Sequence, residues 1–244
     1  MPYSKEIEQL DAAFIAGQFE KNGKSLPYRL YIPQGHEGEK LPLVLFMHGA
    51  GERGTDNIKQ FINGDWLLRR LVEGQDVHPC YILAPQCPEE GDQRWVNEAF
   101  ECGTYCYDQT VLSEPMRLAI DILDMVEEKY PIDRQREYVT GLSMGGYATW
   151  YLISRFPGRF AAAVPVCGGG DPAQAEKIRS VPVWTFHGDQ DDIVPISGTR
   201  SLVDALRQAD GDIRYTEYPG VMHGSWVNAY SEPDLVDWLF SHRL

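Results

Sequence analysis

The feature of this sequence that most constrains its fold is a regular alternation of strand-like and helix-like segments from residue 43 onward. Short apolar runs at 43–48 and 181–187 are separated by amphipathic segments that repeat their apolar residues with helical spacing. Continuous apolar runs are typical of strands covered on both faces. Because parallel strands require crossover connections, the alternation predicts an α/β fold with a mostly parallel sheet and helices on both faces.

Eight strands are expected in that sheet, over residues 12–20, 26–32, 43–48, 80–84, 137–142, 160–167, 181–187 and 213–218. The first two alternate polar and apolar residues, so 12–32 is expected to form an antiparallel edge with one solvated face. Helices are expected over 115–130, 144–156, 198–209 and 231–242, the last opening with a capping box from Ser231 to Asp234. Ligands bind at the carboxyl ends of strands in such sheets, so the chemistry is expected in the loops that follow strands.

The chain is predicted to form a single domain over residues 1–244. It contains no repeat of 20–50 residues and no Ser/Gly-rich linker. Only residues 168–180 separate the strands at 160–167 and 181–187, which is enough for one short helix. No large lid domain is therefore expected at that position.

The charge of the chain bears on its partners and location. With 36 Asp+Glu against 22 Lys+Arg the formal charge is −14, which argues against nucleic acid and anionic membranes as partners. No apolar run approaches the roughly 20 residues needed to cross a bilayer. The first six residues carry acids where a signal peptide has a basic and then an apolar stretch, so a cytoplasmic location is expected, or secretion if a signal has been removed. No pattern indicates an oligomeric state.

The cysteines argue against a disulfide framework and against a zinc site. Their number is odd, and no Cys-x-x-Cys occurs among Cys80, Cys87, Cys102, Cys106 and Cys167. Buried or loop thiols are the default interpretation, and a bond between Cys102 and Cys106 is left open. No metal is predicted.

The strongest local signal is the motif Gly141-Leu142-Ser143-Met144-Gly145, which lies between a predicted strand and a predicted helix. G-x-S-x-G in this context is typical of a tight elbow that exposes the serine hydroxyl above the sheet as a nucleophile. A glycine-rich loop with a capping serine is the alternative. A serine nucleophile also needs a base and an orienting acid.

His223 is the candidate base, because it alone among the six histidines lies in the loop after the last strand. His36, His78 and His242 are predicted at the surface, and His187 is predicted to have a structural role. The acid is expected in the loop after strand 181–187, which offers three aspartates, Asp189, Asp191 and Asp192. A solvated acidic turn is the alternative for that cluster.

Four motifs in this order resemble the α/β-hydrolase superfamily: His48-Gly49-Ala50-Gly51, Gly141 to Gly146, His187-Gly188-x-x-Asp191-x-x-Val194-Pro195 and His223-Gly224. The closest resemblance is to the dienelactone-hydrolase-like esterases and predicted peptidases, a phospholipase/carboxylesterase-like group, whose Gly-Ala-Gly-Glu-Arg-Gly loop matches residues 49–54. The resemblance covers about residues 40–240. It implies Asp191 as the acid, with Asp192 as a close competitor.

The resemblance also implies an oxyanion hole built from the backbone N–H groups of Ala50 and Met144, with Gly51 as a substitute for Ala50. Glu52, Arg53 and Asn57 are expected to brace this loop rather than to act chemically. No metal or organic cofactor is required for such a site.

These residues predict a serine carboxylesterase in which Ser143 attacks an ester of a small molecule and forms an acyl-enzyme, with His223 as base and Asp191 as its orienting partner. A serine peptidase, an aminoacyl hydrolase or an acyltransferase would use the same triad. A non-catalytic binding protein with this fold is a further alternative.

Substrate preference is predicted from the long irregular stretch 85–113, interpreted as an active-site insertion. Its aromatic residues Trp95, Phe100, Tyr105 and Tyr107, with polar neighbours such as Gln86, Arg94 and Asn97, form either a substrate wall or the packing of the loop itself. The first alternative makes Trp95 and Gln86 substrate-binding residues, joined by Trp226 close to His223. An open site of this kind favours short-chain or aromatic esters.

Overall fold

The computed structural model describes residues 3–97 and 103–244. Within them the strands form one eight-stranded sheet in the order β1-β2-β4-β3-β5-β6-β7-β8. From β4 to β8 all neighbours are parallel, whereas β1 and β2, and β2 and β4, are antiparallel. The predicted α/β fold and its antiparallel edge are therefore confirmed. The strands are β1 Ile15–Lys21, β2 Lys24–Tyr31, β3 Leu41–Met47, β4 Tyr81–Pro85, β5 Ile132–Leu142, β6 Ala162–Val166, β7 Val183–Gly188 and β8 Ile213–Tyr218.

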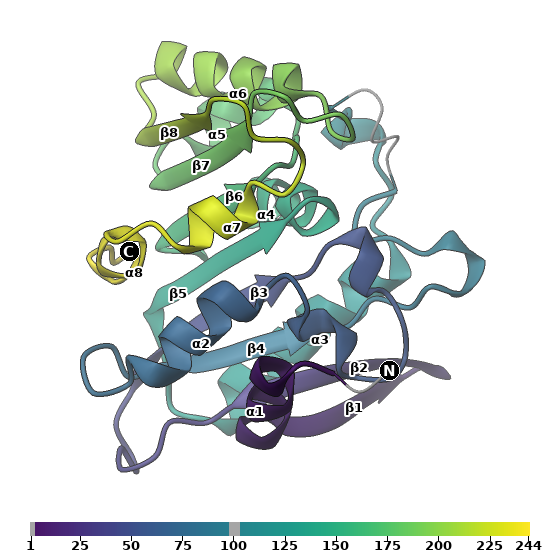
Figure 1. The fold of residues 1–244 in the computed structure, drawn as a ribbon, viewed down its shortest axis with the longest axis vertical. Helices are drawn as coiled ribbons and strands as arrows, with labels where there is room; N and C mark the ends of the chain where they lie inside the picture. The colour runs from purple at the N-terminus through teal and green to yellow at the C-terminus, as the bar shows by residue number, and fades with distance from the viewer. Residues whose placement is uncertain (1–2, 98–102) are drawn as a thin grey trace.

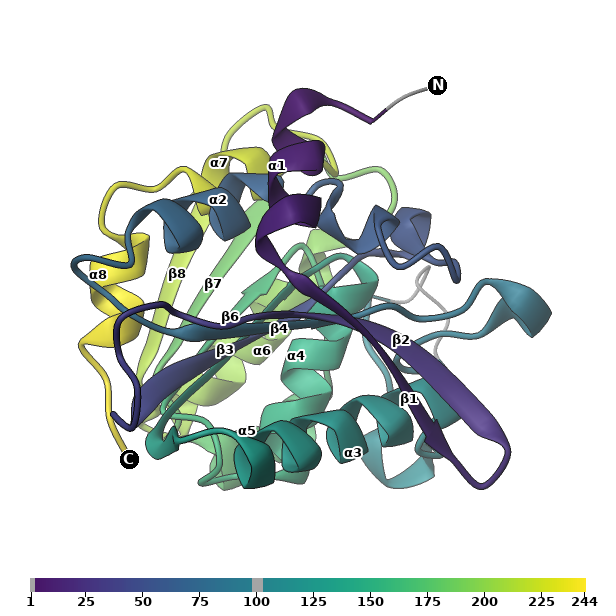
Figure 2. The ribbon, with the colours of Figure 1, turned by 90° about the horizontal axis from the view of Figure 1, so that it is seen from below.

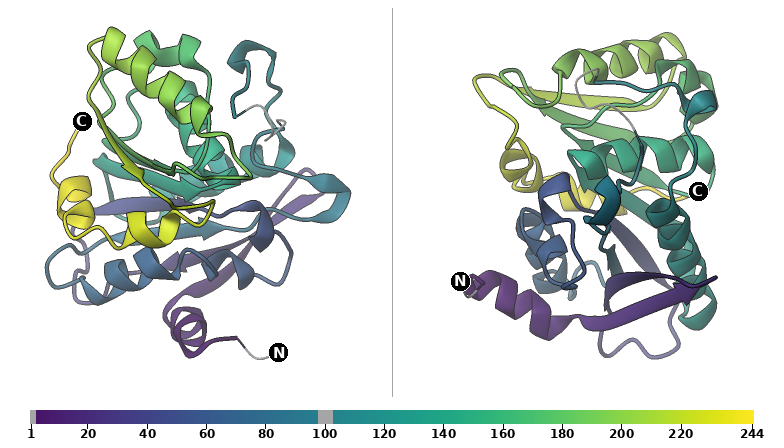
Figure 3. Two further views of the ribbon diagram at one scale, coloured as in Figure 1. Left: turned by 45° about the horizontal axis from the view of Figure 1, so that its top comes forward. Right: turned by 90° about the vertical axis from the view of Figure 1, so that its right-hand side faces the viewer.

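Helices cover both faces of the sheet, as Figures 1 and 2 show. One face carries α1 Lys5–Ala13, α2 Asp65–Glu73, α7 Trp226–Tyr230 and α8 Leu235–Phe240, and the other carries α3 Glu114–Lys129, α4 Met144–Arg155, α5 Ala175–Ile178 and α6 Ile196–Gln208. The antiparallel hairpin of β1 and β2 lies at one end of the molecule, and β7, β8 and α6 lie at the other (Figures 1 and 3). The sheet thus separates two hydrophobic layers.

The central position of strand β3 in the sheet explains why its sequence is apolar throughout. Successive side chains of a strand point to opposite faces. Leu43 and Leu45 pack in the layer of α3 and α4, whereas Val44 and Phe46 pack in the layer of α1 and α2. All seven residues of β3 are buried. The continuous apolar run therefore reflects a central strand with helices on both sides.

Sequence-based assignments were wrong at several places, among them the start of β5, which begins at Ile132, and the helix expected over 231–242, of which α8 covers only Leu235–Phe240. Helices α1 and α2 were not predicted, and the strand expected from residue 12 begins at Ile15 because α1 runs to Ala13. The capping box from Ser231 to Asp234 was also wrong. Ser231 ends α7 as its C-cap, and Asp234, which precedes α8, makes no side-chain cap bond.

The connection between β6 and β7 is short, as expected. It contains the 3₁₀ turn Pro172–Gln174 and the four-residue helix α5. No lid domain is inserted at this place, and the carboxyl ends of the central strands remain close to the loops that carry the candidate site.

A buried charge cluster lies at the amino end of the sheet, opposite that site. Arg159 contacts Asp124 and Glu127 on α3 and, at 3.3 Å, the carboxylate of Glu137 on β5. The Glu137 side chain is only 1 % exposed. Burial, followed by the repulsion of Glu127, raises the pKa of Glu137 to about 7, although Arg159 opposes the shift. The folded protein therefore keeps a proton here that the unfolded chain releases near pH 4.5.

We expect Glu137→Gln to gain stability relative to the wild type as the pH rises through this window. Because the folded wild type binds the extra proton, its own stability falls as the pH rises above the unfolded pKa. The difference in free energy of unfolding between variant and wild type should change by about 2 kcal/mol between about pH 4.5 and 7.5. Urea denaturation at both pH values measures it, with the exposed Glu128→Gln as control. An equal difference at both pH values would contradict the expectation.

Candidate active site

Ser143 lies at a sharp turn between β5 and α4. Its backbone has φ 53° and ψ −117°, a strained conformation for a non-glycine residue. The glycines of the motif are required by close backbone approach. A Cβ atom at Gly145 would collide with the carbonyl group of Met47 at the end of β3, and one at Gly141 would collide with the carbonyl of Gly145. The turn is therefore a strand-to-helix elbow of the kind that the motif predicts.

The elbow brings Ser143 against His223, which lies in the loop after β8. The Ser143 Oγ atom is 2.9 Å from His223 Nε2, and His223 Nδ1 is 2.8 Å from Asp191 Oδ2 in the loop after β7. The Asp191 side chain is fully buried, whereas that of His223 is 17 % exposed. The three residues thus form a continuous chain of hydrogen bonds that ends at the Ser143 hydroxyl.

The carboxylate of Asp191 is held by four donors. Its Oδ1 atom accepts the backbone N–H groups of Ile193 and Val194, and its Oδ2 atom lies within 3.0 Å of both His223 and His187. Burial alone would raise the pKa of Asp191, but these hydrogen bonds hold it well below its usual range. The neighbouring Asp192 is exposed. It is Asp191, not Asp192, that contacts His223.

The two expected oxyanion donors begin two turns that follow neighbouring strands. Met144 is the first residue of α4, and Ala50 begins the 3₁₀ turn Ala50–Glu52 directly after β3. A Cβ atom at Gly49 would lie 2.8 Å from the Leu142 side chain, so this turn packs against the elbow. First-turn amides of a helix have no partner within the helix. The arrangement is suited to bind negative charge next to Ser143.

His48 fixes the peptide that carries the Ala50 amide, a role that sequence reasoning missed. Its Nδ1 atom donates to the Gly49 carbonyl at 2.6 Å, and its Nε2 atom accepts the backbone N–H of Cys87 at 2.9 Å. The Gly49 carbonyl and the Ala50 N–H belong to one peptide unit, so this bond orients both. Burial lowers the pKa of His48 to about 4, so the ring is neutral at pH 7. Its place directly before Gly49 was the available signal.

Known proteins identify the family. The model of the dienelactone hydrolase family matches residues 95–234. The chain belongs to the dienelactone hydrolase family. A crystallised thermostable esterase is similar to it, with 39 % sequence identity and a TM-score of 0.87 over 97 % of this chain and 64 % of that one. Both findings agree with the α/β-hydrolase fold expected from the sequence.

Curated relatives of this family member are longer proteins. The bifunctional acetylxylan esterase/xylanase XynS20E of Neocallimastix patriciarum is 38 % identical over 74 residues, which are 30 % of this chain and 11 % of that protein. An uncharacterized secreted protein of Arthroderma benhamiae is 26 % identical over 236 residues, which are 81 % of this chain and 22 % of that protein. The chain therefore spans only a small part of these relatives.

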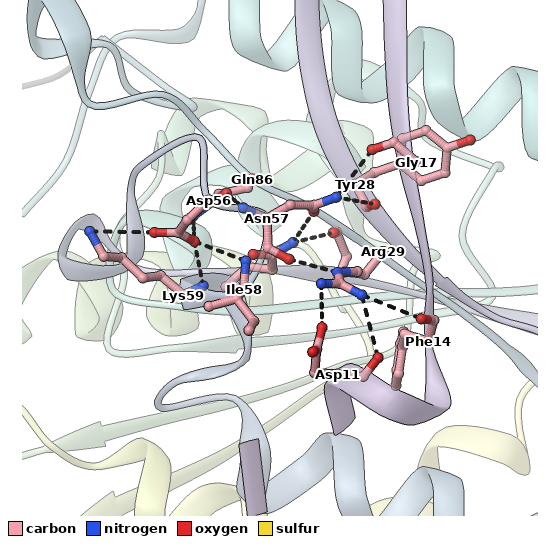
Figure 4. Close-up of polar contacts among 12 residues, drawn as sticks. Asp11, Phe14, Gly17, Tyr28, Arg29, Asp56, Asn57, Ile58, Lys59 and Gln86 are labelled. Atoms are coloured by element: carbon pink, nitrogen blue, oxygen red, sulfur yellow. Dashed lines mark hydrogen bonds and ion pairs between the residues drawn. The ribbon is translucent and has the colours of Figure 1, made fainter. Parts of the chain in front are cut away.

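Gln86 was predicted to bind substrate, and the structure contradicts this. The residue is fully buried. Its Oε1 atom accepts the Asn57 backbone N–H at 2.6 Å, and its Nε2 atom donates to the Glu52 carbonyl and to Asp56. Figure 4 shows Gln86 beside Asn57, whose carbonyl accepts a hydrogen bond from Arg29. Gln86 thus braces the loop after β3, because a substrate could not reach its amide without breaking these bonds.

Trp95 was likewise wrong as a substrate-binding residue. Its ring is fully buried, donates from Nε1 to the His48 carbonyl at 3.1 Å and packs edge-on against the His48 ring. Tyr105 and Tyr107 also turn inward, with rings 6.2 and 5.4 Å from that of Tyr151 on α4. These three aromatic side chains of the insertion 85–113 therefore pack onto the protein. Phe100 lies outside the described residues.

Trp226, the third predicted substrate-binding residue, lies beside the triad. Its ring is half-buried and meets the His223 ring edge-on, with centroids 5.3 Å apart. Ile193 and Met222 flank the acid and the base along the chain and are 56 % and 55 % exposed. We call these three apolar side chains close to the triad the apolar rim.

Cys167 lies close enough to the triad to form a possible ligand group with Asp191 and His223. Its Sγ atom and ligand atoms of Asp191 and His223 lie within 4.8 Å of one another. Burial raises the pKa of the Cys167 thiol well above its usual range, so it is protonated and a poor metal ligand. Cys106 is an exposed free thiol, and its proposed partner Cys102 lies outside the described residues.

The sequence predicts that no apolar segment is long enough to cross a membrane. Within the described ranges, no helix combines the length and the apolar character that crossing a bilayer requires. The cytoplasmic location stays a prediction.

Proposed function

We propose that the protein is a serine carboxylesterase that hydrolyses short-chain or aromatic esters through an acyl-enzyme on Ser143. One observation carries the proposal: the chain of hydrogen bonds from Ser143 Oγ through both ring nitrogens of His223 to a buried, ionised Asp191. Such a chain activates a hydroxyl that is otherwise a poor nucleophile. The thermostable esterase and the acetylxylan esterase among the similar proteins support the same reaction class.

In the proposed mechanism, His223 Nε2 takes the Ser143 proton as Oγ attacks the ester carbonyl carbon. Asp191 accepts the Nδ1–H bond, which holds the ring in the required tautomer and stabilises its positive charge. His223 then donates the proton to the leaving alcohol, and the acyl group stays on Ser143. Water enters, His223 takes its proton, and the same steps release the acid.

The negative oxygen of each tetrahedral intermediate would be bound by the backbone N–H groups of Ala50 and Met144. A single donor of this kind contributes roughly 3 kcal/mol to the stability of the transition state. His48 and Gln86 support this site from behind, since they fix the loop that presents Ala50. No cofactor takes part in any step.

The preference for small esters rests on Trp226, Ile193 and Met222. An apolar rim that is half-exposed or exposed offers contact to one aromatic ring or a short acyl chain. A long chain would extend into water beyond it. Trp95 and Tyr105 of the insertion are buried, so the proposed preference does not depend on them.

A panel of substrates tests the proposal. Aryl acetate and butyrate esters, methyl ferulate, acetylated xylan and a long-chain palmitate ester should be compared with an aminoacyl amide. We expect hydrolysis of the first group, slower turnover of C16 than of C4 esters and no rate jump at the micellar threshold. Faster cleavage of the amide would favour a peptidase, and transfer to added alcohol in place of water would favour an acyltransferase.

A fluorophosphonate probe separates these enzymes from a binding protein with the same fold. The probe reacts only with an activated serine, so the wild type should be labelled in a manner that Ser143→Ala abolishes. An unlabelled wild type would overturn the proposed function.

A further inference from the structure

His187 is a second histidine on the proposed catalytic acid. It lies near the carboxyl end of β7, and its side chain is completely buried. Its Nε2 atom is 3.0 Å from Asp191 Oδ2, the same oxygen that His223 contacts at 2.8 Å. The carboxylate therefore stands between two imidazole rings, of which only one faces Ser143.

The partner of His187 Nδ1 decides the protonation of that nitrogen. Nδ1 is 2.7 Å from the hydroxyl of Thr199 on α6, and this hydroxyl is 2.8 Å from the carbonyl oxygen of Gly168. A hydroxyl has one hydrogen, and a carbonyl oxygen can only accept. The Thr199 hydrogen is therefore directed at Gly168, and its oxygen must accept a hydrogen from His187. Nδ1 carries a proton.

The partners of His187 Nε2 are both acceptors. They are Asp191 Oδ2 at 3.0 Å and the backbone carbonyl of Val194 at 3.1 Å. An unprotonated nitrogen would turn its lone pair toward two oxygen atoms in a buried site, which costs free energy. Nε2 therefore carries a proton as well.

We propose that His187 is a doubly protonated imidazolium that positions Asp191 and shares its negative charge with His223. This inference rests on the proposed function for its kinetic consequence but not for the protonation itself. The structural role expected from the sequence is thereby made specific: His187 is a charged positioning residue and does not contact substrate.

The charges around His187 are consistent with a buried cation. Asp191 comes from its own loop, and Glu217 pairs with His187 in the register of the neighbouring strand β8. Hydrogen bonds from Arg200 on α6 and from Tyr215 hold the pKa of Glu217 below its usual range, with a smaller contribution from His187. The positive charge of Arg200 opposes a cation at His187, but Arg200 is paired with Glu217 at 2.7 Å. His223 contacts the same oxygen of Asp191, and Cys167 nearby carries no charge because burial keeps its thiol protonated.

The proposed cation changes what Asp191 does for His223. A carboxylate already paired with one imidazolium attracts a second positive charge less strongly than a free carboxylate does. Asp191 then stabilises the positive charge that His223 gains with the Ser143 proton less strongly than an unshared carboxylate would. The same pair holds the Asp191 rotamer that orients His223.

Nitrogen-15 NMR of histidine-labelled protein tests the protonation directly, without any activity. The spectrum of the wild type at about pH 7.5 is compared with that of His187→Gln, and the variants of the other five histidines assign His187 by elimination if that variant does not fold. We expect both ring nitrogens of His187 to resonate as protonated nitrogens. One unprotonated ring nitrogen would overturn the proposal, whether or not the protein hydrolyses esters.

The pH profile of kcat/KM tests the effect on His223. His187→Gln keeps an amide donor but removes the charge, so the acid limb should move upward by about one pH unit, while the alkaline plateau falls less than about tenfold. His78→Gln is the matched control. His78 pairs at 2.7 Å with Asp237 of helix α8, which is not a residue of the triad. A folded His187→Gln variant with an unmoved limb would contradict the shared charge. Loss of activity without any probe labelling of the wild type would instead count against the proposed function.

Discussion

Replacing Ser143 with alanine is expected to reduce kcat for ester hydrolysis by about a millionfold, as loss of the nucleophile does in a comparable triad. The Ser143 hydroxyl contacts His223, and the residue as a whole is 8 % exposed. Removal of this one oxygen should therefore leave the free energy of unfolding nearly unchanged. Steady-state rates with an aryl acetate and urea denaturation measure the two effects.

Ser154→Ala is the matched control for this experiment. Ser154 lies on the same helix α4, is 3 % exposed and donates to the Trp150 carbonyl at 2.8 Å. This variant should keep full activity. A Ser143→Ala protein that folds normally and retains more than about a hundredth of the wild-type rate would show that Ser143 is a structural residue.

Asp191→Asn is expected to lower kcat by about 10⁴, because the amide turns the wrong tautomer of His223 toward Ser143. The same variant also removes the negative partner of His187. The control is Asp192→Asn, which makes the same carboxylate-to-amide change at the neighbouring, exposed residue. It should lower kcat by less than about twofold, within the usual range for surface substitutions.

Both variants are compared by kcat at saturating ester and by thermal unfolding. Equal losses of kcat in the two variants, with both proteins folded, would contradict the assignment of the acid to Asp191.

Much of the sheet could be predicted because buried strand positions carry apolar residues, which the sequence shows directly. The strands β3 and β7 are buried throughout and β3 is apolar throughout, since the two faces of the sheet are both covered. Helix α1 was missed because its nine residues bury only Ile7 and Leu10, which is too little to produce a clear periodic stripe. Short helices at the surface are decided by contacts made elsewhere in the fold.

The candidate site was predictable only as a set of residues. The motif around Ser143 and the loop positions of Asp191 and His223 follow from strand order, but their contacts join segments far apart in the chain. Sequence patterns contain no information on whether a loop aromatic faces solvent or a buried carbonyl. Trp95 was therefore assigned to substrate, although its indole N–H satisfies the His48 carbonyl inside the protein.

The double role of Asp191 could not be predicted for the same reason. His187 was recognised as a residue in a hydrogen-bonded position, but its charge depends on Thr199, whose own hydrogen is committed to Gly168. The protonation of a buried side chain thus depends on groups that are two hydrogen bonds away from it.

The central position of β3 has a consequence for the folding of the chain during its synthesis on the ribosome. Leu45 pairs with Val139 of β5, roughly 90 residues later in the chain. At about 5–20 residues per second, the ribosome needs on the order of ten seconds to deliver that partner. During this interval one edge of an entirely apolar strand is unpaired and is open to the same strand of a neighbouring nascent chain. Crowded polysomes, rather than heat or denaturant, are then the condition under which this fold is most exposed to aggregation.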